Sequence, residues 1–203
     1  MKKYAVLHEP GDIVTLAGTR FVVLDVERRG GLPDSLFLLA LEPVGTSEFG
    51  SSNNYAESDL KKAVDKWLED MDKRGLDNAK LIPREIDLTT LDGSGCYGKL
   101  SVKAAPLTLD EARKYADIIP NAERWCWLAT GWGGPSKSDG DYALCVGSGG
   151  DWGGYYCSYS CGIRPALKAP SILFEDSEAG LDLSKIPTDD LLQEIHRRLA
   201  EKA

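Results

Sequence analysis

The first quarter of the chain shows the β-branched runs that are typical of strands. Residues 13–16 and 20–26 form two such runs, and only Ala17, Gly18 and Thr19 separate them. A short connection that contains glycine favours a hairpin between the two runs. After the Gly30-Gly31 break, the continuous apolar run 36–41 predicts a buried strand. The chain is therefore expected to begin as a sheet.

Two later segments carry the spacing of amphipathic helices. Ser58 is a helix N-cap residue, and behind it apolar residues recur at spacings of three and four through residues 59–72. Thr108 and Glu111 form a capping-box pair, which predicts a short helix over residues 109–116. The side chains expected to pack inward are Leu60, Val64, Trp67, Leu68 and Met71 in the first helix, and Ala112 and Tyr115 in the second.

The rest of the chain is less regular. Residues 82–102 are mixed and contain glycine, and they predict no single element. Residues 125–162 are dense in Gly, Ser, Asp and aromatics, which indicates short strands joined by large loops. Residues 163–167 are expected to close the domain. The expected division is a domain over residues 1–168, a linker over 169–187 and an amphipathic helix over 188–203.

The predicted C-terminal helix begins at Thr188 as N-cap and carries one apolar stripe. Leu192, Ile195 and Leu199 form the stripe, and basic residues lie near the C-terminal end, where cations suit the helix dipole. Such a stripe must be buried. It either packs back on the domain, or it forms a homo-oligomer or docks on a partner.

Composition and charge narrow the class of protein. The 203 residues are 42% hydrophobic, which suits one main globular domain, and the net charge of −8 argues against a nucleic-acid partner. The apolar stretch 4–7 is too short for a signal peptide, and no run is long enough to insert in a membrane. We expect a cytoplasmic or virion-associated protein. Five cysteines, an odd and sparse set, favour free thiols in a reducing compartment.

Five motifs occur in order between residues 13 and 168. They are Phe21-Val22-Val23-Leu24-Asp25, Ser58-Asp59-Leu60 with Trp67-Leu68, Leu107-Thr108-Leu109-Asp110-Glu111-Ala112, Trp125-Cys126-Trp127-Leu128 and Gly162-Ile163-Arg164-Pro165-Ala166-Leu167. This ordered set resembles a family of phage and gut-bacterial domains with a C-type lectin-like fold. The resemblance implies an α+β fold with short twisted antiparallel strands, two helices and long loops.

That family is similar to the formylglycine-generating enzymes and to the variable proteins of diversity-generating retroelements. In both groups a Gly-Gly-x-Trp segment precedes the closing strand, and here Gly149-Gly150-Asp151-Trp152 precedes Gly162-Ile163-Arg164. The resemblance implies that Trp152 belongs to the scaffold and that the residues around it are displayed. We expect Trp125, Trp127 and Arg164 to complete the scaffold. An arginine within a closing strand is expected to bridge backbone carbonyls or a carboxylate inside the fold.

The residue types from Ser138 to Ile163 agree with the retroelement group. Adenine mutagenesis of an Asn codon reaches Tyr, Ser, Cys, Asp and Gly, but it never reaches Trp, Lys, Glu, Gln or Met. Every residue in this stretch except Trp152 belongs to the reachable set, although the whole chain is 28% charged. A Gly/Ser-rich loop region that lacks long side chains would show the same composition, so both interpretations remain open.

The same segment has the composition of an adaptable binding surface. Tyrosine gives rigid contact area with a hydroxyl group, and serine and glycine give compact hydrogen bonding. We expect residues 139–160 to bind a protein or glycan on a cell or virion surface. The predicted ligand-binding residues are Asp139, Asp141, Tyr142, Ser148, Asp151, Tyr155, Tyr156, Ser158, Tyr159 and Ser160. Tyr142 is also the tyrosine most expected to pack inward, because it precedes the apolar pair Ala143-Leu144. Trp132 is expected either under the loops or at the rim.

Copper, calcium and zinc sites are the alternatives to ligand binding, but no enzyme activity, cofactor or metal is expected. Cys157 and Cys161 could act as a copper-binding pair of the formylglycine-generating type. Carboxylates in a Gly-rich context suit calcium, but the motifs of sugar-binding lectins are absent. The candidate zinc ligands are Cys126, Cys145, Cys157 and Cys161, without a Cys-x-x-Cys pair, and the candidate calcium ligands are Asp139, Asp141 and Asp151. His8 and His196 have no reason to converge on a catalytic site. A structural phage module that assembles through its C-terminal helix is a further alternative.

Overall fold

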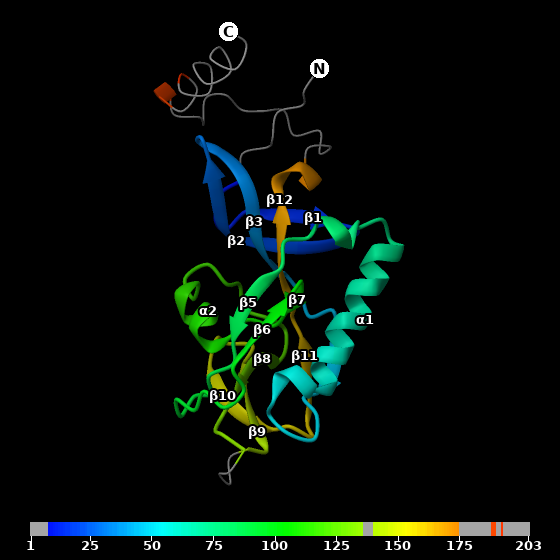
Figure 1. Cartoon of the computed structure of the whole chain (residues 1–203), viewed down its shortest axis with the longest axis vertical. Coiled ribbons are helices and arrows are strands. Elements are labelled where there is room, and N and C mark those ends of the chain that lie inside the picture. The colour runs from blue at the N-terminus through cyan, green and yellow to red at the C-terminus, as the bar shows by residue number, and fades with distance from the viewer. Residues whose placement is uncertain (1–7, 136–139, 175–187, 190–191, 193–203) are drawn as a thin grey trace.

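The computed structural model describes residues 8–135, 140–174, 188–189 and 192, and it is a mixed α+β fold built mostly from sheets. Two five-stranded sheets lie one above the other along the long axis (Figure 1). Sheet A contains, in spatial order, β1 (Ile13–Leu16), β2 (Thr19–Arg29), β3 (Leu32–Ala40), β12 (Ala166–Pro170) and β7 (Ala104–Ala105). Sheet B contains β10 (Trp152–Tyr156), β9 (Tyr142–Val146), β8 (Cys126–Gly131), β11 (Ser160–Ile163) and β4 (Gly45–Glu48).

The N-terminal hairpin forms as the sequence predicts, but its turn is tighter than expected. β1 and β2 pair in antiparallel register from Ile13 opposite Val22 to Leu16 opposite Thr19. The turn therefore consists of Ala17 and Gly18 alone, with φ angles of 45° and 76°. Two positive φ values match the type I′ turn, whose twist agrees with that of the flanking strands. The predicted strand over residues 36–41 is the second half of β3.

Both predicted helices are present. Helix α1 (Asp59–Lys73) begins where the Ser58 hydroxyl accepts a 2.9 Å hydrogen bond from the Lys61 amide. Helix α2 (Leu109–Lys114) has the predicted capping box but ends two residues before the predicted end at residue 116. Helix α1 contacts both β4 and β7 along one side of the molecule, so it spans the two sheets (Figure 1).

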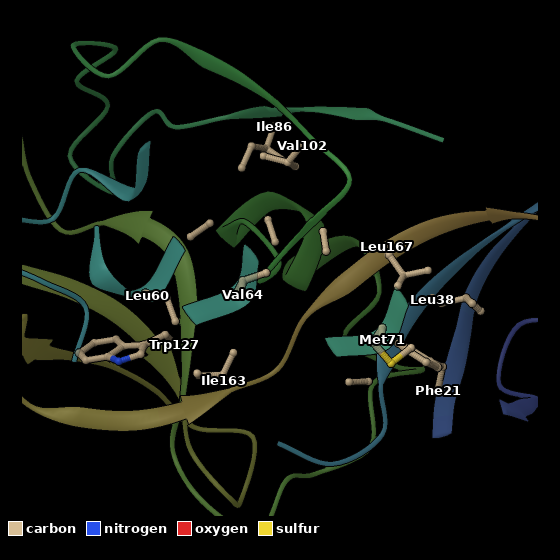
Figure 2. Close-up of a cluster of buried hydrophobic side chains, with 14 of the residues drawn as sticks. Phe21, Leu38, Leu60, Val64, Met71, Ile86, Val102, Trp127, Ile163 and Leu167 are labelled. Carbon is tan, nitrogen blue, oxygen red and sulfur yellow. The ribbon is translucent and has the colours of Figure 1, made fainter. Parts of the chain in front are cut away.

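One core runs through both sheets (Figure 2). Leu60 and Val64 of α1, together with Trp127 and Ile163 of sheet B, occupy one part of it. Met71, near the C-terminal end of α1, reaches the other part. There it joins side chains of sheet A, namely Phe21, Leu38 and Leu167. A second buried cluster packs under α2, and it includes Val22, Leu24, Leu39, Leu107, Ala112, Tyr115, Leu128 and Leu144.

The structure corrects two expectations about the less regular segments. The segment 82–102, for which no element was predicted, contains the antiparallel strands β5 (Arg84–Asp87) and β6 (Lys99–Val102). The large loops expected between the later strands are wrong for two of the connections, because only residues 147–151 separate β9 from β10 and only residues 157–159 separate β10 from β11. Backbone pairing across the sheet, rather than side-chain composition, keeps these connections short.

The fold continues past residue 168, where the predicted linker was placed. Strand β12 pairs with β3 as far as Pro170, and the 3-10 turn η3 (Ser171–Phe174) follows at once. Phe174 is buried in the main core. The first six residues of the predicted linker therefore belong to the domain. The stripe residues Ile195 and Leu199 of the predicted C-terminal helix lie outside the described residues, and its packing or docking stays a prediction. No helix among the described residues is long and apolar enough to cross a membrane.

Candidate functional site

The predicted binding segment forms the end of sheet B. Strand β10 is the last strand of that sheet and pairs only with β9 among the described strands. The register places Tyr156 opposite Tyr142 and Tyr155 opposite Ala143. Because side chains alternate along a strand, Tyr155 and Tyr156 emerge on opposite faces. The predicted tyrosines therefore do not all lie on one face of the strand.

The four predicted tyrosines nevertheless form one continuous set, which we name the tyrosine ridge (Tyr142, Tyr155, Tyr156 and Tyr159). Tyr142 and Tyr156 have ring centroids 4.2 Å apart. Tyr159 lies in the turn after β10, with centroids 5.7 Å from Tyr156 and 5.9 Å from Tyr155. Tyr159 thus joins the two faces of the strand. Tyr156 is 45% exposed and Tyr159 is 51% exposed, so the ridge presents aromatic area to solvent.

Trp152 does not have the scaffold role that the sequence resemblance implied. Its side chain is 45% exposed. Trp125, which is half-buried, is wedged against the β9–β10 hairpin instead. An added Cβ at Gly147 would lie 2.9 Å from the Trp125 ring, and one at Gly153 would lie 3.1 Å from it. The glycines therefore make room for Trp125, and Trp152 is free to be part of the displayed surface.

Trp132 occupies the opposite face of the same hairpin. An added Cβ at Gly154 would lie 2.5 Å from the Trp132 ring, so only glycine fits beneath it. Trp132 is still 37% exposed, which makes it both a cover over the strand and part of the rim. The Gly153-Gly154 pair is thus held between two tryptophans, one on each face of β10. This arrangement fixes the backbone that presents the tyrosine ridge.

Arg164 is a buried scaffold residue, as predicted. Its Nε donates to the Ala40 carbonyl at 2.8 Å, one terminal nitrogen donates to the Pro120 carbonyl at 2.9 Å, and the other donates to Leu41 at 3.0 Å. These acceptors lie at the end of β3 and in the segment before β8. Burial lowers the pKa of Arg164 from its ordinary value. The residue therefore ties together three chain segments, and it uses backbone carbonyls rather than a carboxylate.

The predicted serines and aspartates do not all lie on the same part of the surface. Ser158 and Ser160 are exposed near the tyrosine ridge, whereas Ser148 is exposed in the β9–β10 turn, at the other end of the hairpin. Asp141 and Asp151 are exposed at opposite ends of the β9–β10 hairpin: the Asp141 carbonyl accepts from Cys157 at 2.7 Å, and the Asp151 carbonyl accepts from Gly147 at 2.7 Å. They therefore do not converge on one calcium ion. Asp139 lies outside the described residues, and within those residues no three His, Cys, Asp or Glu side chains are grouped to hold a metal ion.

The cysteines do not form the pair that the copper alternative requires. Cys145, rather than Cys157, lies in hydrogen-bonding contact with Cys161. Cys157 is held through its backbone, and its carbonyl accepts the amides of Phe49 and Gly50 at 2.8 and 3.1 Å. Burial raises the pKa of the Cys157 thiol to about 12. A protonated buried thiol is a weak nucleophile and a poor metal ligand.

We expect thiol alkylation to separate Cys96 from the other four cysteines. Cys96 is exposed, whereas Cys126, Cys145, Cys157 and Cys161 are buried. Burial also raises the pKa of Cys126, to about 11. Treatment of the folded protein with iodoacetamide at pH 8 should therefore add one label per chain, and mass spectrometry of tryptic peptides should locate it on Cys96. Unfolded protein should take up a label at all five cysteines. Rapid labelling of Cys126 or Cys157 in the folded chain, whose pKa values burial raises, would contradict this arrangement.

One residue that organises the site was not predicted from the sequence. The buried Asn53 side chain donates to the Gly133 carbonyl at 2.8 Å and to the Tyr142 carbonyl at 2.9 Å. Its carbonyl oxygen accepts the Tyr97 hydroxyl at 2.5 Å. Asn53 thereby connects the end of β8 to the start of β9. It lies in a polar run, Ser51 to Asn54, with no periodicity, so no sequence signal separated it from an ordinary loop residue.

Comparison with known proteins gave no relative from which a function could be transferred. No protein-family profile, curated protein or solved structure matches the chain.

Proposed function

We propose that this chain is a ligand-binding display protein with a C-type lectin-like arrangement, of the kind encoded by diversity-generating retroelements. Its binding surface is the segment 139–160, centred on the tyrosine ridge. The ligand is a protein or a glycan on a cell or virion surface. The observation that carries the proposal is the exposed, continuous ridge on the end strand of sheet B, which is fixed from both faces by tryptophans.

Tyrosine at such positions suits binding for physical reasons. A tyrosine ring buries a large area at a small cost in side-chain entropy, and its hydroxyl group adds a hydrogen bond. Ser158 and Ser160 flank the ridge and are exposed. Because the backbone beneath is already ordered by Trp125 and Trp132, little of the binding free energy is needed to fix it.

The structure divides the segment into displayed and fixed positions, and this division sharpens the retroelement hypothesis. Gly147, Gly153 and Gly154 have no room for a side chain against Trp125 or Trp132. Diversification of the segment must leave these glycines unchanged if the products are to fold. The positions open to variation are Asp141, Ser148, Asp151, Trp152, Tyr156, Ser158, Tyr159 and Ser160, all of which are exposed. The Trp152 side chain is exposed, so the fold leaves room for substitution there, although adenine mutagenesis does not generate a tryptophan codon.

Deep sequencing of the coding locus in a population of the source organism tests the retroelement hypothesis. Variation is expected to cluster at the exposed positions of the segment 139–160, and the three constrained glycines are expected to stay invariant. Variation spread evenly over the chain, or a segment with no variation at all, would overturn the hypothesis. The tyrosine ridge would then require a different biological explanation.

Removal of the Tyr156 side chain is expected to weaken binding to the cognate surface by tenfold or more, because loss of a central aromatic contact removes about 1–2 kcal/mol or more of binding free energy. The measurement is a glycan array or a cell-binding assay with labelled protein, followed by a titration on each positive surface. Ile13→Ala is the matched control: Ile13 is 49% exposed, but it lies on β1 in sheet A, at the other end of the molecule (Figure 1). Equal loss in both variants would assign binding to another surface.

A further inference from the structure

A hollow of about 380 Å³ lies beside the tyrosine ridge, between the turn after β10 and the start of β11. Three aromatic side chains, two serines and one buried thiol line it. The lining residues are Trp125, Tyr155, Ser158, Tyr159, Ser160 and Cys161. No acidic or basic side chain is among them, so the wall is aromatic with a hydroxyl rim.

The planes of the three rings that line the hollow are inclined to one another and are not stacked in parallel. The Trp125 and Tyr155 centroids are 5.3 Å apart, with their planes inclined at 58°. Tyr155 and Tyr159 repeat this arrangement, with centroids 5.9 Å apart and an inclination of 58°. Three successively tilted rings can present π-electron density to one point in this open hollow. Such a point attracts a cation, and cation–π contact requires that the cation approach within about 6 Å of each centroid.

The charges around the hollow also favour a cation. Arg124 precedes Trp125 in the chain. Its Cγ atom would lie 3.2 Å from a Cβ atom added at Gly162, and the Cys126 sulfur is also close to that position. The Arg124 side chain therefore lies against Gly162, and it does not line the hollow. The residue paired directly across from Ser160 is Glu48, which is exposed on the outer strand β4. The chain as a whole carries a net charge of −8.

We propose that this hollow is an aromatic cage that binds a methylated ammonium group, such as the quaternary ammonium of a choline-like ligand. The inference rests on the proposed binding function and gives its ligand a chemical class. A quaternary ammonium ion has no N–H donor, so it needs no hydrogen-bond acceptor from the wall. Its methyl groups fit an apolar, aromatic surface, and its charge is stabilised by the ring faces.

The cage is held in shape before a ligand arrives. The Trp125 ring is fixed against Gly147 and Gly153, and the Trp125 carbonyl accepts the Gly162 amide at 2.8 Å. The Tyr159 amide donates to the Tyr156 carbonyl at 2.9 Å, which fixes the turn that carries the third ring. A preformed site loses little side-chain entropy on binding.

The test compares choline with 3,3-dimethylbutan-1-ol, its uncharged isostere, by calorimetric or NMR titration of the whole chain. Choline and tetramethylammonium are expected to bind with millimolar or tighter affinity, and the neutral isostere is expected to bind about tenfold or more weakly, because the cation–π contribution is absent. Equal binding of choline and the isostere, or no binding of choline, would overturn the proposal.

Substitutions locate the site. Tyr159→Ala should weaken choline binding by about tenfold, and Tyr159→Phe should keep most of the affinity, since the ring rather than the hydroxyl group contacts the cation. The control is Ile172→Ala, which removes an exposed apolar side chain of η3, outside the proposed binding surface and outside the lining of the hollow. Circular dichroism of each variant verifies the fold. Choline affinity that is unchanged in Tyr159→Ala would overturn the assignment to this hollow.

Further measurements identify the biological source of the ammonium group and test the cage separately from the display function. Phosphatidylcholine vesicles, a trimethyl-lysine peptide and free phosphocholine distinguish a lipid headgroup, a modified protein and a small molecule or cell-wall substituent. Competition by choline in the cell-binding assay tests whether the cage is the recognition site. Cell binding that requires Tyr156 and is unaffected by choline would overturn the cage as the recognition site and retain the display function. Choline binding without cell or glycan binding would retain the cage and overturn the display function.

Discussion

Replacement of Arg164 by methionine is expected to lower the free energy of unfolding by about 3–5 kcal/mol. The methionine keeps the aliphatic length but leaves the carbonyls of Ala40, Leu41 and Pro120 without their donor. Hydrogen bonds from a charged donor contribute about 1.5–3 kcal/mol each, and the relief of burying the charge offsets part of the sum. Chemical denaturation followed by circular dichroism measures the change.

Two further variants separate hydrogen bonding from charge. Arg124→Met removes an exposed arginine two residues before the start of β8 and should change stability by no more than about 0.5 kcal/mol. Arg164→Lys keeps the positive charge but cannot reach three carbonyls with the same planar geometry, so its stability should fall between those of the wild type and Arg164→Met. A lysine variant as stable as the wild type would show that the charge alone is sufficient.

Truncation of Trp127 to alanine is expected to be comparably severe, with a loss of about 3–5 kcal/mol. Trp127 is almost completely buried in the centre of sheet B, where it packs edge-on against Phe49 with centroids 5.4 Å apart. Its Nε1 donates to the Ser47 carbonyl of β4 at 2.9 Å. Removal of the ring leaves a cavity in the main core, the cluster whose members Trp127 and Leu60 are labelled in Figure 2.

Trp132→Ala is the matched control for the same residue type. Trp132 is 37% exposed and covers Gly154 from one face, so its removal should cost clearly less than the removal of Trp127. The melting temperatures of the two variants, measured side by side, give the comparison. Equal destabilisation would mean that the cover over β10 contributes as much as the centre of the core. The division between a fixed framework and a displayed ridge would then be wrong.

The local elements were predictable because each carries its own signal. The Ser58 cap with its periodic apolar face predicted α1, and the Thr108–Glu111 pair predicted α2. The buried role of Arg164 was also predicted, although the residue lies in the connection between β11 and β12 and not within one closing strand. In these cases the physical cause lies within a few residues of the chain: a cap satisfies the nearest amides, and a 3.6-residue period buries one face. The composition of residues 139–160 indicated an exposed aromatic surface, and exposed tyrosines are present there.

The sequence placed Trp125, Trp127 and Trp152 in the scaffold, and the tertiary structure alone excluded Trp152 and decided which tyrosines share a face. Trp125 and Trp152 are not distinguishable by residue type, and the choice between them depends on which ring meets the space above Gly147 and Gly153. The pairing of Cys161 with Cys145, and the bonds of Asn53 to Gly133 and Tyr142, join strands that are distant in sequence. Such contacts depend on strand order and register, which local sequence patterns do not specify, because a shift of one residue moves every side chain to the other face of the sheet. The sequence therefore determined the N-terminal hairpin, the two helices and the chemistry of the exposed segment, and the sheet determined how that chemistry is arranged.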